Sequence, residues 1–283
     1  MDVQMTTERI GNLRLDRARP DRPTGAAPVL YVHGMWGGSW YFENYLRFTA
    51  ARGREAWAIN LRGHHGSRPV ADLARVTLEE YVHDVADVLD AIGPAVVVGH
   101  SMGGLLAQAV AARPDVGAAV FVASVPPAGL SLLRWALLRR APRYLGAALG
   151  PRAFRVREAD ARALALNAVP AALQAGLAAR FVHDSGRVAR HLALGALPSL
   201  PRPRCPVLVV GAARDRLTPA ALQRRIAARY GADYIEAAEC GHMLPIEPDW
   251  LPSIRGVLAW LDARTARTHE PAPTSVAAGA LAG

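Results

Sequence analysis

The segment Val96-Val97-Val98-Gly99-His100-Ser101-Met102-Gly103-Gly104 is the most informative part of the sequence. An apolar run is followed by a Gly-x-Ser-x-Gly motif and then by residues 105–112, which are good helix formers. This order predicts a strand, a tight turn and a helix, with one side chain exposed at the carboxyl end of the strand. Gly99 and Gly103 leave room where strand and helix come close. The residue at the tip of the turn is Ser101.

Short apolar strands alternate with helices on both sides of this segment. We expect strands at 29–32, 56–59, 118–122, 206–210 and 234–236. Alternation of this kind predicts an α/β fold, with a mostly parallel central sheet covered by helices on both faces. Ahead of it, residues 3–19 turn at Gly11-Asn12 and suggest a hairpin. Further on, Thr77 and Glu80 form a capping-box pattern at the start of a helix that reaches Ile92.

Residues 128–198 differ from the rest of the chain. They contain no convincing strand and many alanines, leucines and arginines, in helix-length pieces separated at Pro142, Pro151, Pro170 and Gly186. We therefore predict an α/β core made of residues 1–127 and 199–264. An inserted helical cap would span 128–198, a helix would end near Ala263, and a disordered tail would span 265–283.

Composition limits the classes of function. All 33 basic residues are arginines, so the formal net charge of +9 reflects a composition bias, and we expect no nucleic-acid partner. Two cysteines, Cys205 and Cys240, are too few for a disulfide scaffold, so we expect reduced thiols and a cytoplasmic location. The N-terminus shows no signal-peptide pattern. The apolar stretch 116–138 is interrupted by prolines and an arginine, so no transmembrane segment is expected.

Polar residues follow several of the predicted strands, at the edge of the sheet where ligands gather in such folds. A serine hydroxyl is a weak nucleophile unless a base removes its proton, and His242, after the last strand, is the candidate base. Asp215, in the pattern Gly-x-x-x-Asp after the predicted strand 206–210, is the candidate acid that orients it. Glu239 and Glu247 are other carboxylates that a loop could supply.

An acyl-transfer reaction also requires two N–H donors aimed at the oxyanion of its tetrahedral intermediate. The backbone N–H of Met102 lies at the predicted helix start, directly after Ser101. The second donor is expected in the loop His33-Gly34-Met35-Trp36, and we favour Met35 over Trp36. Glycines 37 and 38 would let this loop lie close to a substrate.

In combination these motifs resemble the α/β-hydrolase fold family of esterases, lipases and thioesterases. The matching residues span about 28–263 and include His33-Gly34, Arg62-Gly63, the Ser101 segment, Asp215 and Gly241-His242. The resemblance implies a serine–histidine–aspartate hydrolase without a metal or organic cofactor, and a helical cap at about 128–198. The family pattern Asp-x-Arg-Gly-x-Gly-x-Ser is altered here, with Asn60 for the Asp and His65 for the second Gly. This departure puts the local geometry of that loop in doubt.

The predicted cap carries most of the charge of the chain. Between Ala128 and Pro198 there are eleven arginines and three acidic residues. This balance is explained by a solvated helix face or by an acidic partner, such as a carrier protein, a CoA thioester or an anionic surface. Trp135, in the cap, and Trp36 are candidate substrate-binding side chains.

Three functions follow from the sequence. The first is a hydrolase of a small-molecule carboxylic ester, lactone or thioester, with an acyl-Ser101 intermediate, His242 as base and Asp215 as acid. The second is a thioesterase acting on acyl chains bound to a carrier protein or to CoA. The third is a non-hydrolytic binding or cyclising protein on the same fold.

Overall fold

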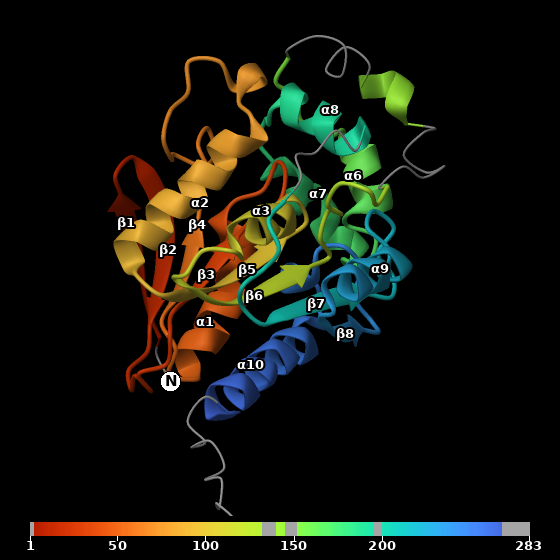
Figure 1. Ribbon diagram of the computed structural model, residues 1–283. Helices are drawn as coiled ribbons and strands as arrows, with labels where there is room; N and C mark the ends of the chain where they lie inside the picture. Colours follow the sequence, from red (N-terminus) through yellow and green to blue (C-terminus); the bar gives the residue numbers. More distant parts are fainter. Residues whose placement is uncertain (1–2, 132–139, 145–151, 195–199, 268–283) are drawn as a thin grey trace, which may run out of the picture.

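The computed structural model of the chain describes residues 3–131, 140–144, 152–194 and 200–267. Within these ranges, eight strands form one sheet in the order β1-β2-β4-β3-β5-β6-β7-β8 (Figure 1). The pairs β1–β2 and β2–β4 are antiparallel, and all other neighbouring strands are parallel. The predicted α/β architecture with a mostly parallel sheet is therefore confirmed.

The strands are β1 (Gln4–Ile10), β2 (Leu13–Arg19), β3 (Val29–Val32), β4 (Ala56–Ile59), β5 (Ala95–His100), β6 (Val116–Val122), β7 (Val207–Ala212) and β8 (Asp233–Ala237). The α-helices are α1 (Glu43–Ala51), α2 (Leu78–Ile92), α3 (Met102–Val110), α6 (Glu158–Leu164), α7 (Ala171–Ala179), α8 (Gly186–Leu194), α9 (Ala220–Tyr230) and α10 (Trp250–Arg267). Short 3-10 helices occur at η1 (Ser39–Phe42), η2 (Leu73–Arg75), η3 (Ala141–Tyr144) and η4 (Leu244–Ile246).

Side chains alternate between the two faces of the sheet, and each face has its own apolar core. On one face the sheet packs against α2, α3 and α9, and on the other against α1 and α10 (Figure 1). The central strands β3 to β7 are buried along almost their whole length, as expected for parallel strands covered on both sides. This burial holds the loops at their carboxyl ends in fixed positions.

Helices α6, α7 and α8 lie between β6 and β7 in the sequence and contact loops at the carboxyl end of the sheet (Figure 1). We call residues 128–198 the insert. Its Val182 N–H donates to the Trp36 carbonyl in the loop after β3. Its Asn167 side chain donates to the Arg214 carbonyl in the loop after β7. The insert is thus attached to the core at two strand ends.

Several local predictions are also confirmed. The hairpin of β1 and β2 turns at Gly11-Asn12, and α2 begins with a complete capping box between Thr77 and Glu80. Helix α10 runs to Arg267, beyond the end that we predicted at Ala263, and residues 268–283 of the predicted tail lie outside the described residues. Within the described residues, none of the helices combines the length and apolarity that crossing a bilayer requires. The cytoplasmic location stays a prediction.

Candidate active site

The turn between β5 and α3 holds Ser101 in a backbone conformation that few residues adopt. Its φ is 57° and its ψ is −118°, which is strained for a residue with a side chain. Two glycines make the turn possible, because a Cβ on Gly99 would meet the Gly103 carbonyl oxygen at 2.0 Å. A Cβ on Gly103 would meet the Val32 carbonyl oxygen of β3 at 2.1 Å. The strained turn lifts Ser101 above the end of β5 while α3 stays packed on the sheet.

The structure brings Ser101, His242 and Asp215 together from three separate loops. Ser101 Oγ lies 3.1 Å from His242 Nε2, and His242 Nδ1 lies 2.9 Å from Asp215 Oδ2. Because a carboxylate at Nδ1 requires a proton there, a neutral His242 has Nε2 free to accept the Ser101 proton. All three side chains are buried, with Ser101 the most exposed at 8%. The arrangement can therefore move a proton from the serine to the imidazole.

Asp215 is held in its charged form by more than His242. Its Oδ1 accepts the backbone N–H groups of Leu217 and Thr218 at 2.7 and 2.8 Å. The Thr218 hydroxyl lies 2.8 Å from Asp215 Oδ2. Burial alone would raise the pKa of Asp215, but the charge and hydrogen bond of His242 and the Thr218 donors hold it below 3.8. The contribution of Thr218 was not predicted from the sequence, where it is only the residue before a proline.

The backbone around His242 is fixed from three directions. Glu247 accepts the Gly241 N–H at 2.5 Å and the Met243 N–H at 3.0 Å, one on each carboxylate oxygen. His100 Nε2 donates to the His242 carbonyl oxygen at 2.7 Å. Glu247 is therefore not an alternative partner for the imidazole, as the sequence had left open, but a support for its loop. Burial and then the His242 charge lower the pKa of His100 to about 3, so His100 is neutral.

The loop after β3 passes directly over Ser101. A Cβ on Gly34 would meet Ser101 Cβ at 2.7 Å, so only glycine fits at this crossing. The next residue, Met35, is thereby carried to the edge of the site. The N–H of Trp36 is already donated to Asp184 Oδ2 at 3.0 Å, which makes it unavailable to a substrate oxygen. Of the two candidate donors in this loop, Met35 is the one whose N–H this contact leaves for a substrate oxygen.

The altered family loop keeps an ordered geometry despite its substitutions. Asn60 is buried and bridges the Ser39 N–H, at 2.9 Å, and the Arg14 carbonyl oxygen, at 3.2 Å. His65, where the family has glycine, adopts a φ of 41° in the left-handed region. The next position, Gly66, also has a positive φ. The substitutions therefore change which side chains stabilise the loop, and His65 takes up the strain that a glycine would avoid.

Of the two candidate substrate-binding tryptophans, only Trp36 can be placed. Its ring packs edge-on against Phe154 of the insert, with centroids 5.5 Å apart, and its indole N–H is buried without a hydrogen-bond partner among the described residues. Trp135 lies outside the described residues. Trp36 is thus at the boundary between the core and the insert.

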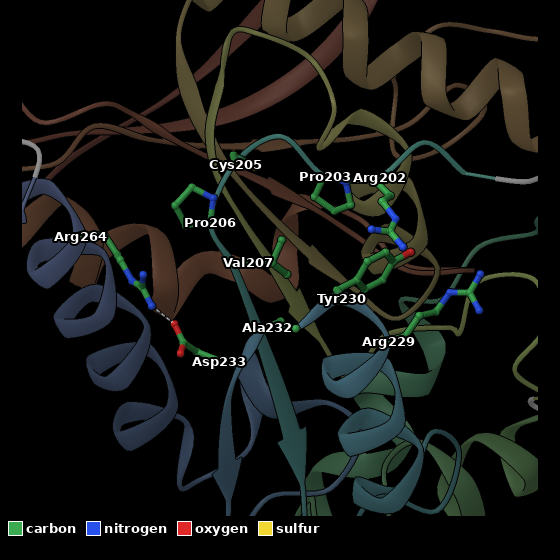
Figure 2. Close-up of a pocket in the computed structure, with 11 residues that line it drawn as sticks. Arg202, Pro203, Cys205, Pro206, Val207, Arg229, Tyr230, Ala232, Asp233 and Arg264 are labelled. Atoms are coloured by element: carbon green, nitrogen blue, oxygen red, sulfur yellow. Dashed lines mark hydrogen bonds and ion pairs between the residues drawn. The ribbon is translucent and has the colours of Figure 1, made fainter.

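A cavity of about 310 Å³ lies at the opposite end of the sheet, where β7 and β8 begin (Figure 2). Arg264 turns to Asp233 on one side of it, and Arg202 and Arg229 lie near Tyr230 on the other. Because the guanidinium groups do not converge, the cavity does not form a single anion site, and it is remote from Ser101. The residues that line it are Arg202, Pro203, Cys205, Pro206, Val207, Arg229, Tyr230, Gly231, Ala232, Asp233 and Arg264.

A mostly parallel sheet with a strained serine turn after β5, an aspartate after β7 and a histidine after β8 defines a hydrolase of the α/β type. The family model described as the alpha/beta hydrolase family matches residues 29–252, and the chain belongs to that family. The structure is also similar to a monoglyceride lipase from Saccharomyces cerevisiae. The TM-score is 0.71 at 12% identity, over 93% of this chain and 97% of that chain. At this identity the likeness shows the fold alone.

Curated relatives share part of the sequence. The chain is 37% identical over 109 residues to a probable esterase, PIR7A, of Oryza sativa, which covers 37% of this chain and 41% of the relative. It is 36% identical over 123 residues to a carbendazim hydrolyzing esterase of a Nocardioides strain, covering 41% of this chain and 48% of the relative. The chain therefore matches less than half the length of these two esterases.

Proposed function

We propose that the chain is a serine hydrolase that cleaves a carboxylic ester, lactone or thioester through an acyl-Ser101 intermediate. The observation that carries this proposal is the hydrogen-bonded series Ser101–His242–Asp215, with separations of 3.1 and 2.9 Å, at the carboxyl end of a parallel sheet. The membership of the α/β-hydrolase family and the esterase names of the curated relatives support the same reaction class.

In the first step, Ser101 Oγ bonds to the substrate carbonyl carbon while His242 Nε2 takes the hydroxyl proton. The carbonyl electron pair moves onto the oxygen, which accepts hydrogen bonds from the N–H groups of Met35 and Met102. The intermediate then collapses, and the leaving alcohol or thiol takes the proton from His242. A water molecule then attacks the acyl-serine in the same way, with His242 again as the base, and the carboxylic acid is released. Asp215 stabilises the imidazolium in both halves of the reaction.

We further propose that the insert is the helical cap of this site. Its contacts with Trp36 and with the Arg214 loop attach it to the two loops that flank the nucleophile. Phe154 and Trp36 would then form part of an apolar wall for the acyl group of a small-molecule substrate. A wall of this kind excludes water and strengthens the hydrogen bonds to the oxyanion.

A fluorophosphonate probe tests the proposed function. We expect one covalent adduct per chain, located on Ser101 by peptide mass analysis, and none in Ser101→Ala. Turnover of p-nitrophenyl esters should disappear in the same variant. An intact mass that stays unchanged after long exposure, together with no ester turnover by the wild type, would favour the non-hydrolytic binding or cyclising alternative and refute the hydrolase.

Carrier-bound or CoA-bound thioesters are a second candidate substrate, and the charge of the insert favours them. Part of that charge is neutralised internally, because Arg140 and Arg143 both pair with Asp160. In the described parts of the insert, Arg152 and Arg187 are exposed and make no ion pair. They are two of several exposed guanidinium groups in the described parts of the insert that could meet an acidic partner.

The test replaces Arg152 and Arg187 together by glutamine. A carrier-linked thioesterase should show an increased KM for acyl-carrier or acyl-CoA substrates and an unchanged KM for a small ester. Arg225→Gln combined with Arg255→Gln, two exposed arginines on core helices, is the matched control for the loss of charge. Equal effects of both double variants, or equal effects on both substrates, would exclude this candidate.

A further inference from the structure

Asp184, in the insert between α7 and α8, is a fully buried carboxylate with an unusual number of donors. Its Oδ2 accepts the Trp36 N–H at 3.0 Å and faces His64 Nε2 at 3.2 Å. Its Oδ1 accepts the Tyr81 hydroxyl at 2.6 Å and the Ser185 N–H at 2.7 Å. Three of these four donors belong to the core. A side chain of the insert is therefore the centre of a polar network inside the core.

The geometry requires His64 to be charged. Its Nδ1 lies 2.9 Å from the Arg62 carbonyl oxygen, which can only accept. Its Nε2 faces the Asp184 carboxylate, which also accepts. Both ring nitrogens must donate, so the ring is an imidazolium. Burial alone would lower the pKa of His64, but the Asp184 charge and these hydrogen bonds raise it above 6.5. His64 and Asp184 thus form an ion pair with neither side chain exposed.

The same part of the insert holds both backbone polar groups of Trp36. Asp184 accepts its N–H at 3.0 Å, and Val182 donates to its carbonyl oxygen at 2.9 Å. Trp36 needs this support, because its φ of 62° is unfavourable for a residue with a side chain. Trp36 follows Met35 directly. The conformation on the carboxyl side of Met35 is therefore set by the insert.

On the other side of Met35, the core fixes the preceding peptide. His33 Nδ1 donates to the Gly34 carbonyl oxygen at 2.8 Å, and His33 Nε2 accepts the Leu61 N–H at 3.1 Å. The pKa of His33 is held well below 6.5 by burial and by the charge on His64, so the ring is neutral, and its two hydrogen bonds fix the tautomer with the proton on Nδ1. The Gly34 carbonyl and the Met35 N–H belong to one planar peptide and point in opposite directions. The hydrogen bond that fixes the Gly34 carbonyl oxygen therefore also fixes the direction of the Met35 N–H.

We propose that Asp184 is a positioning residue for the oxyanion hole: its buried ion pair with His64 and its bond to the Trp36 N–H lock the loop that presents the Met35 N–H. The oxyanion hole is then complete only when the insert is packed against the core. This inference rests on the proposed function and deepens it, because it assigns a role in transition-state stabilisation to a residue that touches no substrate.

A merely structural carboxylate in the insert would behave differently, and Asp160 provides that comparison. It is 2% exposed, pairs with Arg140 and Arg143, and accepts the Tyr144 hydroxyl at 2.7 Å. Like Asp184 it is a buried acid bound by cations and a tyrosine. Unlike Asp184, none of its described contacts reaches the loop after β3. Asp184→Asn and Asp160→Asn therefore form a matched pair.

The experiment measures kcat and KM for a p-nitrophenyl ester and the inhibition constant of a trifluoromethyl ketone. The ketone adds reversibly to Ser101 Oγ and places a negative oxygen in the oxyanion hole. We expect Asp184→Asn to lower kcat about 30- to 100-fold, since a misplacement of about 1 Å costs about 100-fold. Its KM should change less than about threefold, and ketone affinity should fall by the same factor as kcat. Asp160→Asn should leave all three values within about twofold.

Two results would overturn the proposal. One is an Asp184→Asn enzyme with the kcat and ketone affinity of Asp160→Asn. The other is a loss confined to KM. If Asp184→Asn does not fold, His64→Gln removes the cation and the Nδ1 bond to the Arg62 carbonyl oxygen, keeps a donor for Asp184, and must lower kcat and ketone affinity together. An unchanged kcat in that variant refutes the role. A wild type that neither turns over ester nor labels with fluorophosphonate refutes the hydrolase itself, and the two failures are thereby told apart.

Discussion

Replacing Glu247 by glutamine tests whether the histidine loop is held by a carboxylate. Each of its oxygens accepts one backbone N–H, from Gly241 and from Met243, on the two sides of His242. Glutamine has the same shape but one acceptor oxygen, so its amide group would face one of the two N–H groups. The substitution therefore removes one hydrogen bond and leaves the imidazole in place for the other contacts.

The size of the effect follows from the same contacts. A hydrogen bond to a charged group contributes about 1.5–3 kcal/mol. Part of this loss is offset because a neutral amide is less costly to bury than a carboxylate, and burial raises the pKa of Glu247 above 4.5. We expect a net loss of about 1–2 kcal/mol in the free energy of unfolding. Since the His100 bond to the His242 carbonyl persists, kcat should fall about tenfold, equivalent to about 1.4 kcal/mol.

Urea unfolding and steady-state kinetics at pH 8 measure both quantities. Glu239→Gln is the control, because Glu239 is exposed and pairs only with Arg214 among its described contacts. It should change stability by less than about 0.5 kcal/mol and leave kcat within about twofold. If Glu247→Gln keeps the wild-type kcat while losing stability, the carboxylate supports the fold without positioning the imidazole, and our reasoning is wrong.

Three further results are expected. Asp215→Asn should lower kcat about 10⁴-fold, measured with a p-nitrophenyl ester, because the imidazole is no longer held in the useful tautomer. Gly103→Ala should abolish folding or strongly lower Tm, since its Cβ would meet the carbonyl oxygen of a β3 residue at 2.1 Å, whereas Gly117→Ala meets nothing closer than 3.9 Å and should be tolerated. The stability difference between wild type and Asp184→Asn should be largest between pH 3.8 and 6.5, measured by urea unfolding. The pKa of His64 is raised, so its contribution is complete below 6.5 and is lost as the pH rises through the folded value. The pKa of Asp184 is lowered, so its contribution is complete above 3.8 and is lost as the pH falls through the folded value.

The catalytic candidates could be predicted because local patterns place them. The glycines around Ser101 predict a tight turn. The structure explains them, because a Cβ on Gly99 or on Gly103 would clash with backbone atoms. Asp215 and His242 follow predicted strands, and the alternation of apolar runs with helices indicates that these strands lie parallel in one sheet. The carboxyl ends of parallel strands lie on one edge, so residues 114 or more positions from Ser101 can be expected beside it.

The supporting residues could not be predicted, because nothing local distinguishes them. Asp184 and Trp36 are 148 positions apart, and their contact depends on how the insert packs on the core. In the sequence Asp184 is one of three acids among many arginines, and its burial has no periodic signal. From the sequence, Glu247 is expected only as an alternative to Asp215, because sequence spacing does not tell whether a carboxylate faces a ring or a backbone. His65 keeps a left-handed conformation that its residue type disfavours.

The position of Asp184 limits how a substrate can reach Ser101. Lifting residues 182–184 as part of a rigid lid would break the Trp36 hydrogen bonds and leave the His64 and Asp184 charges unpaired. Removing one partner of a buried ion pair costs about 3–5 kcal/mol because the other charge stays buried without a partner. If the His64 charge stays buried when Asp184 leaves, a cost of this size corresponds to a population of the open state below about 1%. The same opening would release the loop that carries Met35. If the oxyanion hole forms only when such a lid is closed, every catalytic cycle includes the free-energy cost of opening the lid. We therefore expect a substrate of the proposed hydrolase to reach Ser101 without displacement of residues 182–184.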